Sequence, residues 1–259
     1  EENTWHGRLV TMIKIYIDDT PNKSGSAKTA TDVPPPPEPS DGLKALARPA
    51  WLWGMTDGEG GPRATRTGGR PIMAESETWP ICGACQNPLT HLAQCDLDAL
   101  PAGMGTHGQG ILRLFYCLQE PCVGMGGWAA FDPQHHLSVT QSGDVRDTPQ
   151  DTPDTPARHI ETYTPVEDYP HYEDRADAGL ATELPEDEEI YAVDGHKYGG
   201  WPCWVQGPER PTCPTCAAVM EPFVQLDNAA EPDFNFGDMG IGHISRCPEH
   251  LEIFAFAWA

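Results

Sequence analysis

The chain repeats itself at a fixed spacing, and this constrains its fold more than any other feature. Eight residues recur 131 positions later without a gap, and all of them are Gly, Pro, Cys, Gln or Asp. The matched pairs are Gly68/Gly199, Gly69/Gly200, Pro71/Pro202, Pro80/Pro211, Cys82/Cys213, Cys85/Cys216, Gln94/Gln225 and Asp96/Asp227. These residue types mark turns, metal ligands and specific polar contacts, which similar hydrophobicity alone would not reproduce. The sequence therefore predicts two copies of one module.

The second copy contains four candidate metal ligands in two short-spaced pairs. Cys213 and Cys216 form a Cys-x-x-Cys, and Cys247 and His250 follow further along the chain as a Cys-x-x-His. Two such pairs on tight turns supply the four N and S ligands of a tetrahedral zinc site. A redox Cys-x-x-Cys is the alternative, but it requires neither the downstream pair nor a second copy.

The first copy follows the same logic with a looser second pair. Cys82 and Cys85 are followed by Cys117, at nearly the spacing that separates Cys216 from Cys247, and then by Cys122. His91 and Cys95 are rival ligands here, and a remnant site whose thiols are merely buried is the alternative. Because each site has four protein ligands, both are predicted to be structural, since a catalytic zinc keeps a position open for water or substrate. The prediction is two structural zinc ions.

The remaining polar residues give weaker signals. Cys95 and Cys203 have no same-type match in the other copy, so they are predicted to be buried or free thiols. Gln94 with Asp96, and Gln225 with Asp227, are predicted to hydrogen-bond to the backbone at the repeat interface, with a binding face as the alternative. No nucleophile, base and oxyanion hole can be assembled, and no phosphate-loop or H-E-x-x-H motif occurs, so no catalytic residue and no enzymatic activity are predicted.

Composition predicts short strands, many turns and little long helix, since the 259 residues include 27 Pro and 26 Gly. Four segments are expected: an N-terminal strand and Pro-rich linker (1–44), the first repeat (45–138), an acidic low-complexity connection (139–190) and the second repeat (191–259). The expected strands cover 9–17, 89–97, 111–117, 128–131, 222–226, a run ending at 247, and 254–258. A capped helical turn is expected at 41–46.

Charge limits the partners that the chain can bind. The formal net charge is −23, and about half of it lies in residues 141–190, which carry a net −12. Such a chain repels nucleic-acid phosphates and anionic membranes and attracts basic proteins. No apolar run approaches the roughly 20 residues that span a bilayer. Nine cysteines without a visible signal peptide favour a reducing compartment, so a cytoplasmic location is expected.

Several motifs resemble the bacterial YwqG-like family of unknown function. They are Gly68-Gly69-Arg70-Pro71, Trp79-Pro80, Leu92 to Leu97 and Leu114-Phe115-Tyr116, then Asp168-Tyr169-Pro170, His196 to Pro202, Gln206, Gly237 to Gly240 and Trp258. The resemblance covers roughly residues 45–259 and follows family order. It implies an internally duplicated, β-rich α+β domain of two pseudo-symmetric repeats, here each with a zinc knuckle, and no established enzymatic activity.

The cysteine pattern is similar to that of programmed cell death protein 2 and its relatives, which act as chaperones of a basic ribosomal protein. Together with the acidic charge, this favours a non-enzymatic protein-binding module for a basic partner, either a chaperone or an immunity protein that occludes a cationic toxin. A zinc-dependent enzyme with one open metal position is the alternative. A redox or metal sensor that uses Cys95 or Cys203 is a third hypothesis.

Overall fold

The structure is a computed structural model. It describes residues 38–258 except 106, 121, 123–125, 178, 181–191, 230–233, 235 and 238–239. The strand expected at 9–17 and residues 181–190 of the acidic connection lie outside the described residues. The two described helices, α2 (Asp41–Lys44) and α3 (Tyr172–Asp177), are both short. Ser40 caps α2 by accepting a hydrogen bond from the Leu43 N–H, so the helical turn expected at 41–46 is confirmed.

Ten strands form one antiparallel sheet, and two more form a separate ribbon. The sheet order is β12-β11-β10-β9-β1-β8-β2-β4-β5-β6, and the ribbon pairs β3 with β7. The strands are β1 (Arg48–Asp57), β2 (Arg66–Thr67), β3 (Ile72–Met73), β4 (Thr90–Asp96), β5 (Ile111–Tyr116), β6 (His135–Thr140), β7 (Asp144–Val145), β8 (Arg158–Asp168), β9 (Lys197–Gly199), β10 (Glu221–Asp227), β11 (Ile241–Arg246) and β12 (Phe254–Trp258).

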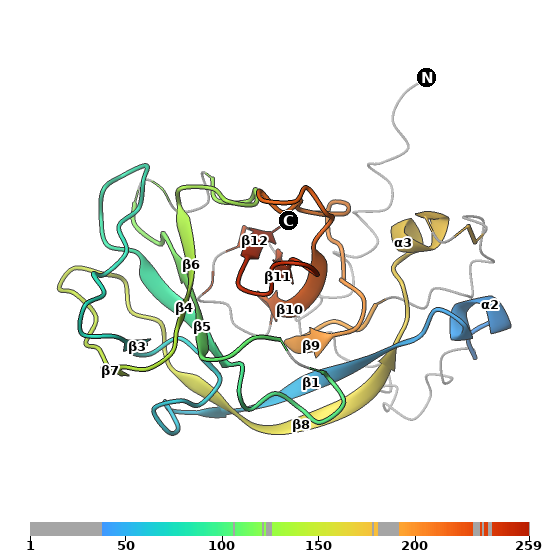
Figure 1. Ribbon diagram of the computed structural model, residues 1–259, viewed down its shortest axis with the longest axis horizontal. Coiled ribbons are helices and arrows are strands. Elements are labelled where there is room, and N and C mark those ends of the chain that lie inside the picture. The colour runs from blue at the N-terminus through green and yellow to red at the C-terminus, as the bar shows by residue number, and fades with distance from the viewer. Residues whose placement is uncertain are drawn as a thin grey trace, which may run out of the picture. The chain divides into compact units, whose positions relative to one another are not determined.

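The two repeats interlock at the centre of this sheet. β1 leads into the first repeat, yet it pairs with β9 of the second. β8 leads into the second repeat, yet it pairs with β2 of the first. β1 and β8 pair with each other along their whole lengths, from Arg48 opposite Asp168 to Asp57 opposite Arg158. Figure 1 shows β1 and β8 as the long strands along the bottom of the view, below the strands of both repeats. The repeats therefore share one sheet and one core.

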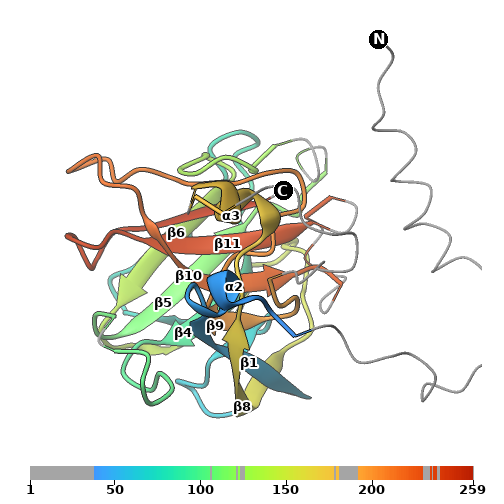
Figure 2. The same cartoon turned by 90° about the vertical axis from the view of Figure 1, so that its right-hand side faces the viewer.

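The sheet curls until its two outer strands approach each other, which overturns the α+β prediction. The rings of His135 on β6 and Phe256 on β12 meet at 5.2 Å between centroids, and the backbone N–H of Trp258 donates to the Trp128 carbonyl at 3.0 Å. The described chain is nearly all-β, with a nearly closed, barrel-like sheet (Figures 1 and 2). Because the curled sheet covers its own apolar face, it needs no helical layer, and Gly- and Pro-rich connections do not form one.

A single apolar core fills the inside of the curled sheet. It includes Trp53 from β1, Leu114 from β5, Tyr198 from β9 and Phe256 from β12, all of them buried. Two smaller apolar clusters lie apart from it, and both contain the predicted metal-ligating cysteines. The core thus joins the repeats, while each metal-ligand group has its own small cluster.

The sequence predicted five of the strands within the repeats but not β1, β2, β3, β6 or β9. The strands expected at 89–97, 111–117, 222–226, up to 247 and 254–258 correspond to β4, β5, β10, β11 and β12. The strand expected at 128–131 is wrong, because the chain forms turns there and the next strand is β6. The alternation of Phe254, Phe256 and Trp258 predicts a half-buried strand, but all five residues of β12 are buried because it lies against the core and next to β6. No helix among the described residues is long and apolar enough to cross a membrane.

Candidate metal centres

Each Cys-x-x-Cys lies on a tight turn closed by the backbone. In the first repeat the Gln86 N–H donates to the Cys82 carbonyl at 2.9 Å, and the Cys82 N–H donates to the Asn87 carbonyl at 2.8 Å. Gln86 has a φ of 63°, in the left-handed region that reverses the chain within few residues. An isolated bridge between Ile81 and Pro88 closes the turn.

The second repeat builds the same turn at the matching positions. The Ala217 N–H donates to the Cys213 carbonyl at 2.8 Å, and the Cys213 N–H donates to the Ala218 carbonyl at 2.9 Å. Ala217 has a φ of 59°, and Thr212 bridges to Val219. The internal repetition seen in the sequence is therefore a repetition of backbone geometry. Below, these two turns are called the knuckles.

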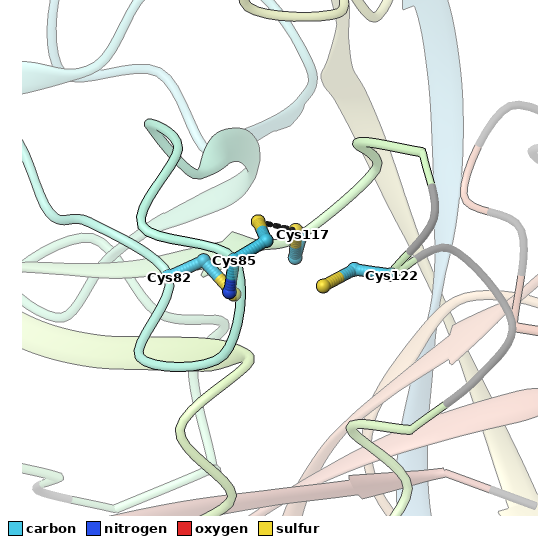
Figure 3. Close-up of side chains that lie close together, drawn as sticks. All are labelled: Cys82, Cys85, Cys117 and Cys122. Carbon is cyan, nitrogen blue, oxygen red and sulfur yellow. Dashed lines mark hydrogen bonds between the residues drawn. The ribbon is translucent and has the colours of Figure 1, made fainter.

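The second ligand pair of each repeat follows the strand next to the knuckle's own strand. Cys117 comes directly after β5, and Cys122 lies five residues on. Cys247 comes directly after β11, and His250 lies three residues on. Because β4 pairs with β5, and β10 with β11, the sheet brings each pair beside its knuckle. Figure 3 shows the side chains of the first group converging from these two segments.

The structure brings all eight predicted ligands together in two groups of four. One group is Cys82, Cys85, Cys117 and Cys122, and the other is Cys213, Cys216, Cys247 and His250; within each, the ligand atoms lie within 4.8 Å of one another. His91 and Cys95, the rival ligands, lie outside the first group. Two groups that could each hold a metal ion are thus present, as predicted from the spacing.

The distances between ligand atoms fit a tetrahedral ion. The Sγ atoms of Cys85 and Cys117 are 3.6 Å apart, as are those of Cys216 and Cys247. The His250 Nδ1 lies 3.7 Å from the Cys247 Sγ and 3.8 Å from the Cys213 Sγ. A tetrahedron with metal–sulfur bonds of about 2.3 Å has edges of about 3.8 Å, whereas a disulfide needs about 2.05 Å. The spacing therefore fits ion ligands and not disulfides.

The surroundings favour thiolate at some of these sulfurs. Burial raises the pKa of Cys85, but the Asn87 N–H and the neighbouring thiols outweigh it and hold the pKa at about 7. Burial also raises the pKa of Cys213, but the N–H groups of Cys216 and Thr215 hold it at about 6. Burial and the thiols of Cys85 and Cys82 raise the pKa of Cys122 to about 11. Several thiolates cannot share so small a volume without a cation to neutralise them.

The two groups differ in composition and exposure. The first has four sulfurs, of which only Cys85 is partly exposed. The second replaces one sulfur with the imidazole of the half-buried His250, and Cys216 is exposed. Bound to the same divalent ion, four thiolates would leave more negative charge than three thiolates and a neutral imidazole. The second centre is therefore the more accessible and the less negative of the two.

Cys95 and Cys203 stand apart from both centres. Cys95 is buried inside the sheet, and burial raises the pKa of its thiol to about 12. Cys203 is half-buried, and burial likewise raises the pKa of its thiol to about 11. A thiol with so high a pKa is a poor nucleophile at neutral pH.

The repeated glutamines hydrogen-bond to the backbone, as predicted, but each does so within its own repeat and not at the interface between the repeats. Gln94 donates to the carbonyls of Pro62 and Ala64 at 3.0 and 2.9 Å and accepts from the Ile72 N–H at 3.2 Å. Gln225 makes the same three bonds in the second repeat: it donates to the Val193 and Gly195 carbonyls at 3.2 and 3.0 Å and accepts from the Cys203 N–H at 2.9 Å. Both glutamines are buried, so they form no binding face.

Sequence reasoning missed two buried cations beside these glutamines. Arg66 and Lys197 are opposite Gln94 and Gln225 in the strand register, and both are completely buried. They occupy matching positions of the two repeats, but a search for identical residue types does not pair Arg with Lys. A comparison by charge would have found them.

One comparison with known proteins identifies a family. Residues 65–257 match the model of a domain of unknown function, DUF1963. No curated protein matches the chain. The matched range begins just before β2 and ends within β12, so it contains both candidate metal centres.

Proposed function

Because the chain belongs to the DUF1963 family, whose function is unknown, we propose a role from its own residues: a non-enzymatic module that binds a basic protein and is stabilised by two structural zinc ions. The resemblance to YwqG-like proteins and a cytoplasmic location form part of this proposal. The observation that carries it is the complete set of four ligands in each of two groups.

Zinc is the ion that these ligand sets suit best. Sets of four cysteines, or of three cysteines and one histidine, with tetrahedral spacing are typical of structural zinc. Cys82, Cys85, Cys117 and Cys122 would hold one ion, and Cys213, Cys216, Cys247 and His250 the other. When bound, zinc supplies cross-links between a knuckle and the end of the neighbouring strand. Structural zinc contributes on the order of 10 kcal/mol of apparent folding free energy, which would stabilise the loop-rich parts of both repeats.

Zinc content tests this half of the proposal. Protein purified without added metal is expected to contain two zinc ions per chain by elemental analysis. Cys82→Ser and Cys213→Ser should each reduce this to one ion, and Cys95→Ala should leave both, because Cys95 lies outside both groups. Wild-type protein with no zinc, or single variants that keep both ions, would refute the assignment.

The alternative is a zinc-dependent enzyme with one open metal position. The complete ligand sets argue against it, since a catalytic zinc normally has three protein ligands and one open position. Replacing Cys122 or His250 separates the two. A structural site predicts that the variant loses both metal and a cooperative unfolding transition, whereas a catalytic site predicts a folded protein with altered activity.

The basic partner is proposed from charge. A net charge of −23 draws cationic proteins over long distances and makes their association dependent on salt. A chaperone for a nucleic-acid-binding client and an immunity protein against a cationic toxin both fit this description. The test is titration with polylysine, with polyglutamate as the control. Binding should weaken steeply as NaCl increases, and no binding at low salt would refute the proposal.

A further inference from the structure

An aromatic pocket with an acidic wall lies beside the seam where the sheet nearly closes. Its lining residues are Trp128, Gln206, Gly207, Pro208, Glu209 and Trp258, and its volume is about 420 Å³. Ligand sites commonly measure roughly 300 to 1,000 Å³, so it can hold a single large side chain. None of the six lining residues is basic.

The two tryptophans are held in fixed positions. The backbone N–H of Trp258 donates to the Trp128 carbonyl at 3.0 Å, which ties the segment before β6 to the end of β12. Their rings meet edge to face, with centroids 6.5 Å apart and planes at 81°. Trp258 is 8% exposed and forms the base, whereas Trp128 is 51% exposed. A half-exposed tryptophan lacks much of the free energy that its full burial would provide. Such exposed aromatic rings are common where a ligand covers them.

The opposite wall is also anchored. The Trp204 indole N–H donates to Asp174 of α3 at 2.8 Å, and Arg210 pairs with the same carboxylate at 2.7 Å. These two contacts fix both ends of the segment that contains Gly207, Pro208 and Glu209. The pocket therefore needs little ordering before it binds a ligand.

Two carboxyl groups lie at the pocket, and Glu209 is the one without a partner among the described residues, since Glu173 Oε2 lies 3.4 Å from His171 Nδ1. Glu209 is half-buried, has no hydrogen bond or ion pair within the described part of the chain, and burial raises the pKa of its carboxyl group. The Glu173 Oε1 lies 3.7 Å from the point where a Cβ on Gly207 would be. The nearby Arg210 does not neutralise Glu209, because Arg210 pairs with Asp174. A cation is the ligand that an unpaired carboxylate beside an exposed indole would attract most.

We propose that this pocket binds a lysine or arginine side chain of the basic partner, with the cation against the Trp128 ring and paired with Glu209. The inference rests on the proposed function, since it names the place where a basic polypeptide docks. It requires no movement of the sheet. It also explains why a large aromatic side chain remains exposed on so acidic a protein.

Two probes test the pocket on the full chain. The first is Nα-acetyl-lysine amide, followed through the tryptophan indole N–H signals in NMR spectra. The second is a peptide of alternating Lys and Gly, followed by calorimetry, with the same peptide carrying acetylated lysines as the uncharged control. Trp128→Ala should weaken the charged peptide about tenfold, and Trp128→Phe should weaken it less, because indole binds cations best. Glu209→Gln should weaken it several-fold and reduce its salt dependence.

A matched control distinguishes binding in the pocket from attraction by the overall negative charge of the protein. Asp144→Asn removes one exposed carboxylate on β7, which is not among the lining residues, and should leave the affinity nearly unchanged. If the peptide binds in a salt-dependent manner but every variant binds as wild type does, the pocket assignment is wrong and the proposed function stands. If the lysine amide shifts the Trp128 signal but the peptide does not bind, the proposed function fails and the pocket stands. If neither probe binds, both are wrong.

Discussion

The two repeats have the same hydrogen-bonded backbone framework, but different groups surround the buried cation in each. Arg66 in the first repeat donates to the carbonyls of Pro62 and Arg70, and Lys197 in the second donates to the carbonyls of Val193 and Trp201, which are the corresponding positions. Lys197 also pairs at 2.7 Å with Asp168, and both side chains are completely buried. Among the described residues, no completely buried carboxylate faces Arg66.

A second pair of positions differs in the same manner. Arg113 lies opposite Gln94 in the register, and His243 lies opposite Gln225. Arg113 pairs with Glu77 at 2.7 Å and also donates to the Ile72 carbonyl. Neither ring nitrogen of His243 has a hydrogen-bond partner within the described residues. Burial first, and Lys197 second, lower the pKa of His243 to about 3, so it is neutral at physiological pH.

Comparing the two repeats distinguishes the contacts that both of them make from the contacts that differ between them. The amide of the buried glutamine makes the same three bonds in both repeats, so the position of the backbone segments that it joins depends on it. The charged neighbours differ: Lys197 pairs with a buried carboxylate, whereas Arg66 donates to backbone carbonyls and has only the partly exposed Glu59 nearby. An unpaired buried charge would cost several kcal/mol. The two repeats should therefore respond alike to loss of the glutamine and differently to loss of a cation.

The largest expected difference concerns the buried cations. Lys197→Met leaves Asp168 charged and buried without its cation, which should cost about 3–5 kcal/mol of unfolding free energy. Arg66→Met removes hydrogen bonds to carbonyl groups and an attraction to the partly exposed Glu59, which keeps its pairing with Arg70, and should cost about 1.5–3 kcal/mol. Urea unfolding of the zinc-loaded proteins measures both.

The control for the Lys197→Met prediction is the double variant that carries Lys197→Met and Asp168→Asn. Neutralising the carboxylate should recover part of the loss in Lys197→Met, since the penalty comes mainly from the unpaired charge. Equal losses for the two single variants, with no recovery in the double variant, would mean that the buried pair does not distinguish the repeats.

A smaller effect tests the shared framework. Gln94→Ala and Gln225→Ala each strip hydrogen bonds from buried backbone groups and should each cost about 2–3 kcal/mol. The two losses should agree closely because the bonds correspond one to one. Gln141→Ala, at an exposed site, is the matched control and should change stability little. If Gln94→Ala and Gln225→Ala lowered the unfolding free energy by clearly different amounts, the frameworks of the two repeats would not be equivalent.

The knuckles were predictable because their information is local. A Cys-x-x-Cys on a tight turn needs only a few residues, and the second ligand pair follows the adjacent strand. β4, β5, β10, β11 and β12 were also predictable, since their runs of apolar and β-branched residues are bounded by turns. The sequence thus indicated the ligand groups and the strands that bring them together.

The central pairing of β1 with β8 was not predictable in the same manner. It joins residues about 110 positions apart, and β8 contains Pro165, which argues against a position inside a sheet. The structure tolerates this proline because β2 pairs only with Arg158 and His159, so the rest of β8 has no neighbour on that side among the described strands. β8 also has mostly exposed or half-buried residues, so its acidic sequence resembles a loop. The pairing of β1 with β8 joins the strands of the two repeats into the one sheet that curls and nearly closes. Because the sequence did not reveal this pairing, it did not predict the nearly all-β fold, and the α+β prediction was wrong.

The smallest expected effect concerns two buried neutral histidines, one in each repeat. Burial lowers the pKa of His243 to about 3, and burial together with nearby Arg66 and Arg113 lowers that of His91 to about 3. The ordinary value of about 6.5 applies after unfolding. Between these values only the unfolded chain binds the proton, so stability is full above pH 6.5 and falls as the pH decreases toward 3. Each histidine should cost about 1 kcal/mol between pH 6.5 and 5.5.

Replacing these histidines should make unfolding less sensitive to acid by similar amounts. His243→Leu and His91→Leu are compared with wild type by urea unfolding at both pH values, in excess zinc so that acid does not strip the metal. Each variant should lose about 1 kcal/mol less than wild type over this range. The Nδ1 of His91 donates to the Gly69 carbonyl at 3.0 Å, so its variant should also be less stable at every pH, whereas His243 makes no such bond within the described residues. An unchanged pH dependence in either variant would show that this histidine is already protonated in the folded protein at pH 5.5, and the repeats would then differ in one more buried charge.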